Sequence, residues 1–273
     1  MMEMGRRRFD RLLKSRIRVA RHAARAAIAG DAKAIHELRV AARSLRRTLP
    51  ALTRSEDRPV VQRVRQKLRA AIRLLGPIRD RDVGRLHLTS LPDDGATGTA
   101  VKQRLISDSD RDRAIALANC RERWPRGFFR VLSTVARLPE PSTNRMRRRT
   151  LKLVRRSLKS AERAFEELDA RPSSSRLHEL RKRIRDLRYL LELSAEIGLP
   201  SKVDITSLKA LQSELGDCQD LIVAARWCRG VGDGSPEVLA EARRLRARAR
   251  TRLREFLMPR ARSVSRGAAF LVH

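Results

Sequence analysis

The sequence predicts an all-α protein. Apolar residues recur at three- and four-residue spacing along nearly the whole chain, and alanine, leucine and arginine dominate it. No segment alternates apolar and polar residues as a half-buried strand does. Runs rich in proline, glycine, serine and aspartate stop these periodic segments. They fall at residues 29–32, 91–99, 138–144, 171–175, 198–203 and 230–236. The segments between them suit antiparallel helices joined by short loops.

The chain also repeats itself. Residues 36–49 read HELRVAARSLRRTL and residues 178–191 read HELRKRIRDLRYLL, with eight of fourteen positions identical. A second shared element follows each copy: Leu75-Gly76 with Asp80 and Val83, and Leu215-Gly216 with Asp220 and Val223. The repeat predicts a duplication, with an N-terminal helical bundle half at 1–140 and a C-terminal helical bundle half at 141–273.

The first helix of each half carries a basic stripe. Six cations at three- and four-residue spacing share one side of a helix that turns about 100° per residue. They are Arg7, Arg11, Lys14, Arg18, Arg21 and Arg25 in the first copy, and Arg145, Arg149, Lys152, Arg156, Lys159 and Arg163 in the second. Neither stripe contains an acid, and like charges at i, i+4 oppose helix formation by roughly 0.2–0.5 kcal/mol per pair. This cost favours a polyanionic ligand.

The second helix of each half presents a basic face headed by a histidine. In the first copy the face contains His36, Arg39, Arg43, Arg46 and Arg47, and a separate apolar stripe contains Leu38, Ala41, Ala42, Leu45 and Leu49. In the second copy His178, Arg181, Lys182, Arg185 and Arg188 oppose Leu180, Ile184, Leu187 and Leu191. The apolar stripes should face the core. A structural donor role for each histidine stays open. The last helix, with arginine at every second position from Arg244 to Arg254, indicates a diffuse positive field.

The charge balance requires an anionic partner. Lys and Arg number 63 against 31 Asp and Glu, which gives +32, and only nine of the 63 are lysine. Arginine favours bidentate capture of phosphate or carboxylate. A GC-rich coding bias would also raise arginine and alanine together. Aromatics are 3% of the chain, too few for stacking platforms that read single-stranded bases.

Other classes of function find little support. No apolar run approaches the roughly 18–20 residues that span a bilayer, and the N-terminus lacks a signal-peptide apolar stretch, so we expect a cytoplasmic protein without membrane partners. No P-loop, GxGxxG or HExxH motif occurs. The basic faces lack the carboxylates that hold Mg²⁺ in phosphoryl transfer. Cys120, Cys218 and Cys228 form no CxxC pair. We expect a non-catalytic protein with no cofactor and no metal.

A His-x-x-Arg-x-x-x-Arg-x-x-Arg helix that occurs twice, each time followed by Leu-Gly-x-x-x-Asp, resembles the CHAD family, the conserved histidine α-helical domain. The resemblance covers nearly the whole chain. It implies two pseudo-symmetric antiparallel four-helix bundles that form one CHAD domain with a central basic groove or pore. The chain lacks the Glu-x-Glu-x-Lys strand of the triphosphate tunnel enzymes to which many relatives are fused, so it resembles a stand-alone member.

The same resemblance implies a ligand. Members bind inorganic polyphosphate in the basic groove, and several associate with polyphosphate granules. The implied ligand set is His36, Arg39, Arg43, Arg46 and Arg47 with His178, Arg181, Lys182, Arg185 and Arg188, and the first-helix stripes would extend it. Two alternatives stay open: a nucleoid-associated protein that binds nucleic acid, and an accessory module of polyphosphate or triphosphate metabolism.

Overall fold

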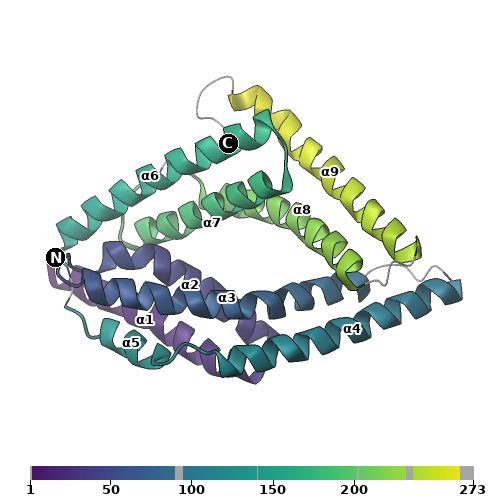
Figure 1. Ribbon diagram of the computed structural model, residues 1–273. Coiled ribbons are helices and arrows are strands. Elements are labelled where there is room, and N and C mark those ends of the chain that lie inside the picture. The colour runs from purple at the N-terminus through teal and green to yellow at the C-terminus, as the bar shows by residue number, and fades with distance from the viewer. Residues whose placement is uncertain (1, 90–94, 140, 202, 232–235, 265–273) are drawn as a thin grey trace. The chain divides into compact units, whose positions relative to one another are not determined.

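The computed structural model describes residues 2–89, 95–139, 141–201, 203–231 and 236–264. Within these ranges every regular element is a helix, which confirms the all-α class (Figure 1). The helices are α1 (Met2–Ala29), α2 (Ala32–Leu52), α3 (Arg58–Thr89), α4 (Gly95–Glu122), α5 (Phe128–Val135), α6 (Thr143–Ala170), α7 (Ser174–Glu196), α8 (Ile205–Val231) and α9 (Pro236–Val264).

Polar residues at the expected breaks cap the helices that follow them. Asp31 Oδ1 accepts from the Ala34 amide at 2.6 Å, and Ser173 Oγ accepts from the Arg176 amide at 3.3 Å. Before α8, Asp204 accepts from the Ser207 amide at 2.8 Å. Each cap satisfies one of the amides that a helix start leaves without an intrahelical partner.

Two boundaries differ from the sequence-based expectation. Residues 53–57 separate α2 from α3, and residues 123–127 separate α4 from α5. The first run, TRSED, contains serine and aspartate but neither glycine nor proline, so its composition marks it only weakly, whereas the second, RWPRG, contains proline and glycine and was missed. From the sequence, Asp80 and Asp220 could either cap a helix after the glycine or hold a neighbouring arginine. The capping alternative is wrong, because α3 and α8 run without interruption through both positions.

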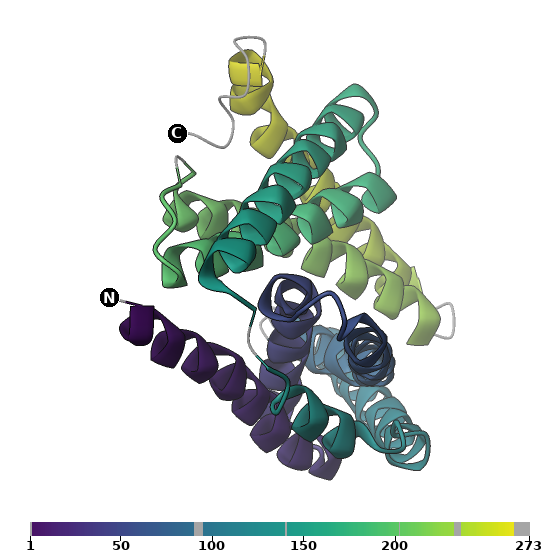
Figure 2. The same cartoon turned by 90° about the vertical axis from the view of Figure 1, so that its left-hand side faces the viewer.

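Contacts divide the chain into two compact units. Unit 1 comprises Met1–Arg79, Ala116–Leu158 and Asp186–Ser201. In it α1 packs along α2, and Figure 2 shows the two helices side by side. Its core includes Leu38, Leu45, Leu68, Leu75 and Phe128, each at most 1% exposed. Burial of these side chains stabilises the unit by about 25 cal/mol per Å² of apolar surface removed from water.

Unit 2 comprises Asp80–Ile115, Lys159–Arg185 and Lys202–His273. Within it α8 packs against α9. Leu221 and Ala225 of α8 meet Leu245 and Ala249 of α9 in a buried cluster. The rings of Phe165 and Phe256 lie with centroids 6.5 Å apart.

Each unit contains residues from both sides of position 140, so contacts divide the chain differently from the repeat. The N-terminal half at 1–140, the C-terminal half at 141–273 and the pseudo-symmetry of two bundles therefore stay predictions. Across the described ranges, no helix is long and apolar enough to cross a membrane.

Candidate anion-binding surfaces

Helix α2 presents the expected face in unit 1. Its apolar stripe is buried, with Leu38, Ala42, Leu45 and Leu49 all at 0% exposure. His36 on the other side is exposed, and Arg39, Arg43, Arg46 and Arg47 are half-buried. The amphipathic pattern of the sequence is thus confirmed for this helix.

Arg39 has a structural contact that the sequence did not reveal. Its Nη1 donates to the carbonyl oxygen of Ile72 on α3 at 3.0 Å. A Cβ at Gly76 would lie 3.4 Å from the same Nη1, so the glycine makes room for the guanidinium. In unit 2 the repeat reproduces this arrangement, because a Cβ at Gly216 would lie 3.7 Å from Nη2 of Arg181. The two repeated elements of each copy, the histidine helix and the Leu-Gly element, therefore pack together through an arginine and a glycine.

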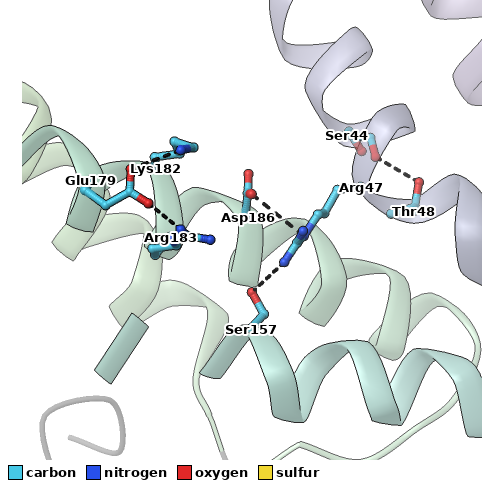
Figure 3. Close-up of polar contacts among 8 residues, drawn as sticks. All are labelled: Ser44, Arg47, Thr48, Ser157, Glu179, Lys182, Arg183 and Asp186. Carbon is cyan, nitrogen blue, oxygen red and sulfur yellow. Dashed lines mark hydrogen bonds and ion pairs between the residues drawn. The ribbon is translucent and has the colours of Figure 1, made fainter. Parts of the chain in front are cut away.

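Arg47 is held by residues from two other helices of unit 1. Its Nε lies 3.8 Å from Asp186 Oδ2 of α7, and its Nη2 donates to Ser157 Oγ of α6 at 3.4 Å. Figure 3 shows the guanidinium between these two partners. The basic faces are thus not wholly without acidic partners, although the stripes themselves contain no acid. Arg145 Nη1 likewise lies 4.0 Å from Glu56 Oε1.

A basic cavity of about 530 Å³ opens where the α2–α3 loop meets α6, and we call it the α2–α3 cavity. The guanidinium of Arg149 donates to the Thr53 carbonyl oxygen and the Ser55 hydroxyl, and so fixes the loop against α6. No carboxylate lines the cavity within the part of the chain that the structure describes. Its cationic lining residues are Arg54, Arg58, Arg65, Arg149, Lys152 and Arg156.

A smaller pocket of about 160 Å³ continues along α3. It shares Gln62 and Arg65 with the α2–α3 cavity and adds Arg46, Gln66 and Arg69. Arg46 is thereby placed with basic residues of α3 that the repeat did not single out. Their signal was present in the sequence, because Arg58, Gln62, Arg65 and Arg69 recur at spacings of four, three and four, which share one helix face.

Arg65 lies at the junction of the two hollows. Its Nε is buried and has no hydrogen-bond partner among the described residues. Burial lowers the pKa of its guanidinium, and the charges of Arg47 and Arg69 lower it further. Half-buried Arg65 is thus a cation without a counter-charge among the residues that the structure describes, and its burial is costly unless an anion compensates it.

The first-helix stripes are largely exposed to solvent among the side chains described, except that Arg149 is half-buried. In α1 the side chains of Lys14, Arg18, Arg21 and Arg25 are exposed, whereas those of Arg7 and Arg11 lie outside the described residues. In α6, Arg145, Arg149, Lys152 and Arg156 belong to unit 1, and the last three line the α2–α3 cavity. Lys159 and Arg163 belong to unit 2 and are exposed.

Unit 2 contains the second histidine cluster. His178 is exposed, and Arg181, Lys182 and Arg185 are half-buried beside it on α7. Glu179 accepts from Lys182 at 3.0 Å and pairs with Arg183 at 2.5 Å, as Figure 3 shows. Partial desolvation acts to raise the pKa of Glu179, but the hydrogen bonds and charges of these two cations hold it below its usual value.

Arg188 of the predicted set falls in unit 1. Its Nη1 donates to Glu192 Oε1 at 3.0 Å, and its guanidinium lies 5.0 Å from the ring centroid of Tyr189. Whether the His36 face and the His178 face both line one central basic groove or pore stays a prediction.

Both histidines have a pKa below the usual value for the same reasons. For His36, partial desolvation comes first, followed by the charges of Arg79, Arg43 and Arg39, against which Glu37 acts weakly. For His178, desolvation is followed by the charges of Arg181, Arg185 and Lys182, and Glu179 opposes them. Both rings therefore favour the neutral form in the free protein.

Comparison with known proteins identifies the family. The CHAD domain matches residues 11–229 of this chain. The chain belongs to the CHAD domain family. Two solved structures share the CHAD fold of this protein. The CHAD domain from the plant Ricinus communis is 20% identical, with a TM-score of 0.62 over 92% of this chain and 91% of that one. PptA from Streptomyces chartreusis is 14% identical, with a TM-score of 0.65 over 92% of this chain and 97% of that one. No functionally curated protein matches.

The CHAD match covers both histidine helices and ends at residue 229, before α9 begins at Pro236. Within the part of the CHAD domain that the structure describes, no group of three His, Cys, Asp or Glu residues could hold a metal ion. Cys120, Cys218 and Cys228 are all buried. Burial raises the pKa of each thiol, for Cys228 to about 11, so these thiols are poor nucleophiles in the folded protein.

Proposed function

We propose that this protein binds inorganic polyphosphate, and that the α2–α3 cavity with the adjoining Arg65 pocket is one place where the polymer lies. The observation that carries the proposal is Arg65, a half-buried arginine with a buried Nε that lies near like charges and borders a hollow in which no described lining residue is a carboxylate. Phosphate oxygens supply the charge and the acceptors that this side chain lacks, and they accept from arginine forks in bidentate fashion. The family resemblance, which implies polyphosphate as the ligand, adds independent support.

The chemistry of a linear phosphate polymer suits the elongated lining. The two hollows share Gln62 and Arg65, so their cations follow one face of α3 over about three turns from Arg58 to Arg69. Polyphosphate offers a negative charge at every unit, and a row of cations can therefore engage several units at once. The amides of Gln62 and Gln66 can donate between the charged contacts.

The decisive experiment compares two double variants of the full chain. R65Q/R156Q removes two cations that line the cavity, whereas R63Q/R155Q removes two exposed arginines from the same two helices that do not line it. Titration calorimetry with long-chain polyphosphate should show weaker binding by about tenfold or more for the first variant, and a change within about twofold for the second. Equal losses in both would mean diffuse charge alone, and would contradict a defined site.

The contribution of the two histidine faces requires its own variants. R43E and R185E each reverse one charge on α2 or α7. If the faces are redundant, each single variant binds polyphosphate nearly as well as the wild type and only the double variant loses binding. Full binding by the double variant would remove both faces from the ligand set.

We also propose that binding is not accompanied by catalysis. The lining residues of the α2–α3 cavity and the Arg65 pocket include no carboxylate that could hold Mg²⁺ against a phosphoryl group. Incubation of polyphosphate with the protein and Mg²⁺ or Mn²⁺ should release no phosphate. Release that scales with protein concentration would contradict this proposal and favour a hydrolase.

Nucleic acid is the second candidate ligand, which the net charge of +32 favours. The two candidates differ in shape, because a duplex needs a broad basic surface and a phosphate chain fits a narrow row of cations. Competition decides between them. Duplex DNA should fail to displace long-chain polyphosphate at equal phosphate concentration, and displacement would make nucleic acid the principal ligand.

Co-sedimentation of the protein with polyphosphate granules tests the granule association. A separate role as an accessory module requires an enzyme partner in the same fraction.

A further inference from the structure

Another cavity lies within unit 2, and its lining includes none of the residues proposed to bind polyphosphate. It measures about 450 Å³ and opens between α8, α9 and the start of α7, and we call it the α9 cavity. Its floor is apolar and consists of Ile222 from α8 with Ala249, Leu253 and Leu257 from α9. Pro172, Ser173 and Ser174 close one side. Because the CHAD match ends at residue 229, the α9 wall lies outside the matched stretch.

Four arginines surround this floor. Arg226 comes from α8, and Arg246, Arg250 and Arg254 come from α9. The three on α9 follow at four-residue spacing, so their Cα atoms rise about 6 Å apart along one side of the helix. In the sequence the alternate arginines of this helix indicated a diffuse field. In the structure they divide into a row that lines a cavity and others that face elsewhere.

The local acids neutralise arginines outside the cavity. Arg252 Nη1 donates to Asp217 Oδ2 at 3.1 Å, and Arg244 Nη1 lies 3.7 Å from Glu241 Oε2. Among the residues that the structure describes, no carboxylate lines the α9 cavity itself. Arg226 donates instead to a neutral acceptor, Ser174 Oγ, at 3.4 Å. The cavity therefore combines four cations with an apolar floor, and an occupant must have both several negative charges and an apolar part.

We propose that the α9 cavity binds a nucleoside triphosphate. Its volume lies within the roughly 300–1,000 Å³ of small-molecule sites, which likewise combine apolar walls with a few charged groups. A triphosphate carries about four negative charges near neutral pH, the number of arginines present. The guanidinium row holds the phosphates, and the base covers Leu253 and Leu257, where an arginine plane can stack on it. A chain of phosphates alone would leave the apolar floor uncovered.

Two properties of the ligand follow. The described lining residues include no Asn, Gln, Asp or Glu side chain to read the edges of a base, so purine and pyrimidine nucleotides should bind alike. They also include no carboxylate to share a divalent cation. Mg²⁺ should therefore weaken binding, because it neutralises charges that the arginines would otherwise engage.

The test uses the full chain and ATP in the presence of EDTA, measured by titration calorimetry. R246Q/R250Q removes two cavity arginines, and R243Q/R248Q removes two exposed arginines of the same helix that do not line the cavity. We expect R246Q/R250Q to weaken ATP binding about tenfold or more and R243Q/R248Q to change it within about twofold. No binding by the wild type, or equal losses in both variants, would overturn the proposal.

Ligand comparisons test the remaining parts without any substitution. CTP should bind as ATP does, excess Mg²⁺ should weaken both, and inorganic triphosphate should bind more weakly than ATP because it leaves the floor uncovered. Inorganic triphosphate that binds as tightly as ATP would overturn the assignment to a nucleotide. Stronger binding of ATP in the presence of Mg²⁺ would contradict a site in which arginines alone hold the phosphates. Two cross-tests separate this proposal from the proposed function. R246Q/R250Q should still bind polyphosphate, and R65Q/R156Q should still bind ATP.

Discussion

At the scale of single residues, charge without compensation distinguishes the candidate sites from the rest of a strongly basic surface. Many arginines of this chain are paired, as Arg16 is with Glu196 at 2.6 Å and Arg113 is with Asp82 at 2.6 Å. Arg65 is different, because the neighbouring charges that act on its pKa are those of Arg47 and Arg69. Such a residue lowers the stability of the free protein and is relieved by an anion.

Arg65→Gln should therefore separate stability from binding. Removal of the i, i+4 repulsion with Arg69 should raise the free energy of unfolding by about 0.2–0.5 kcal/mol, while polyphosphate binding weakens. Urea unfolding of the ligand-free protein measures the first effect. Arg63→Gln removes the corresponding repulsion with Lys67, so this control should gain similar stability while its polyphosphate binding stays unchanged. A clear loss of stability in Arg65→Gln would show that the side chain is needed for the fold.

The histidines predict a pH dependence with a defined sign. Desolvation and neighbouring cations lower the pKa of His36 and His178 in the free protein. Phosphate groups beside them would raise it again, so binding would take up protons and affinity should increase as the pH falls from 8 toward 6. Calorimetric titrations with polyphosphate at these two pH values measure the effect. The variant H36Q/H178Q should show a flatter profile, and equal affinity of the wild type at both pH values would contradict the mechanism.

At the scale of elements, the two arginine–glycine contacts show what the duplication preserves. The guanidinium of Arg39 lies against α3 at Gly76, and that of Arg181 lies against α8 at Gly216. Each glycine lies within a continuous helix, where glycine is normally unfavourable by about 1 kcal/mol relative to alanine. The close approach of an arginine gives a physical reason for this residue.

The two glycines should respond differently to alanine. At Gly216 the new Cβ would meet Arg181 at an ordinary contact distance of 3.7 Å, so Gly216→Ala should raise the free energy of unfolding by about 0.5–1 kcal/mol. At Gly76 the distance to Arg39 is 3.4 Å, and part of this gain should be lost because Arg39 must shift from the Ile72 carbonyl. Chemical denaturation of both variants measures the difference. A larger gain for Gly76→Ala would contradict the proposed role of the contact.

The helices were predictable from local pattern, and the cavities were not. Periodicity and capping residues are properties of neighbours in sequence, so α2 and α7 could be placed with their buried and basic faces. The α2–α3 cavity depends on α6 packing against a loop about ninety residues away in the chain, as in the contact of Arg149 with Thr53. Arg65 was missed for a different reason. At the offset of the Leu-Gly elements its counterpart is Ile205, so a search guided by the repeat passes over it.

At the scale of the whole molecule, the net charge of +32 acts on both the fold and its ligand. Self-repulsion destabilises a compact state of high charge, and salt screens it over a Debye length of about 8–10 Å near physiological ionic strength. The same screening weakens the attraction for a polyanion, from which binding also releases counterions.

Salt should therefore have opposite effects on stability and on affinity. Raising NaCl from about 0.05 M to 0.5 M should increase the melting temperature of the free protein and decrease the affinity for polyphosphate. Thermal denaturation and calorimetry on the same samples measure the melting temperature and the affinity. K₂SO₄ at matched ionic strength then tests whether sulfate binds to the protein, in which case its effect would exceed that of NaCl. Affinity that is insensitive to NaCl would contradict an electrostatic site.

The three buried cysteines allow local opening of each unit to be measured by the rate of thiol labelling. Cys120 lies in unit 1, whereas Cys218 and Cys228 lie in unit 2, and each must reach solvent before a disulfide reagent can react with it. The rate of labelling at each position therefore reports how often its own surroundings open. Peptide mapping of the labelled thiols over time would show in which unit a bound ligand slows local opening.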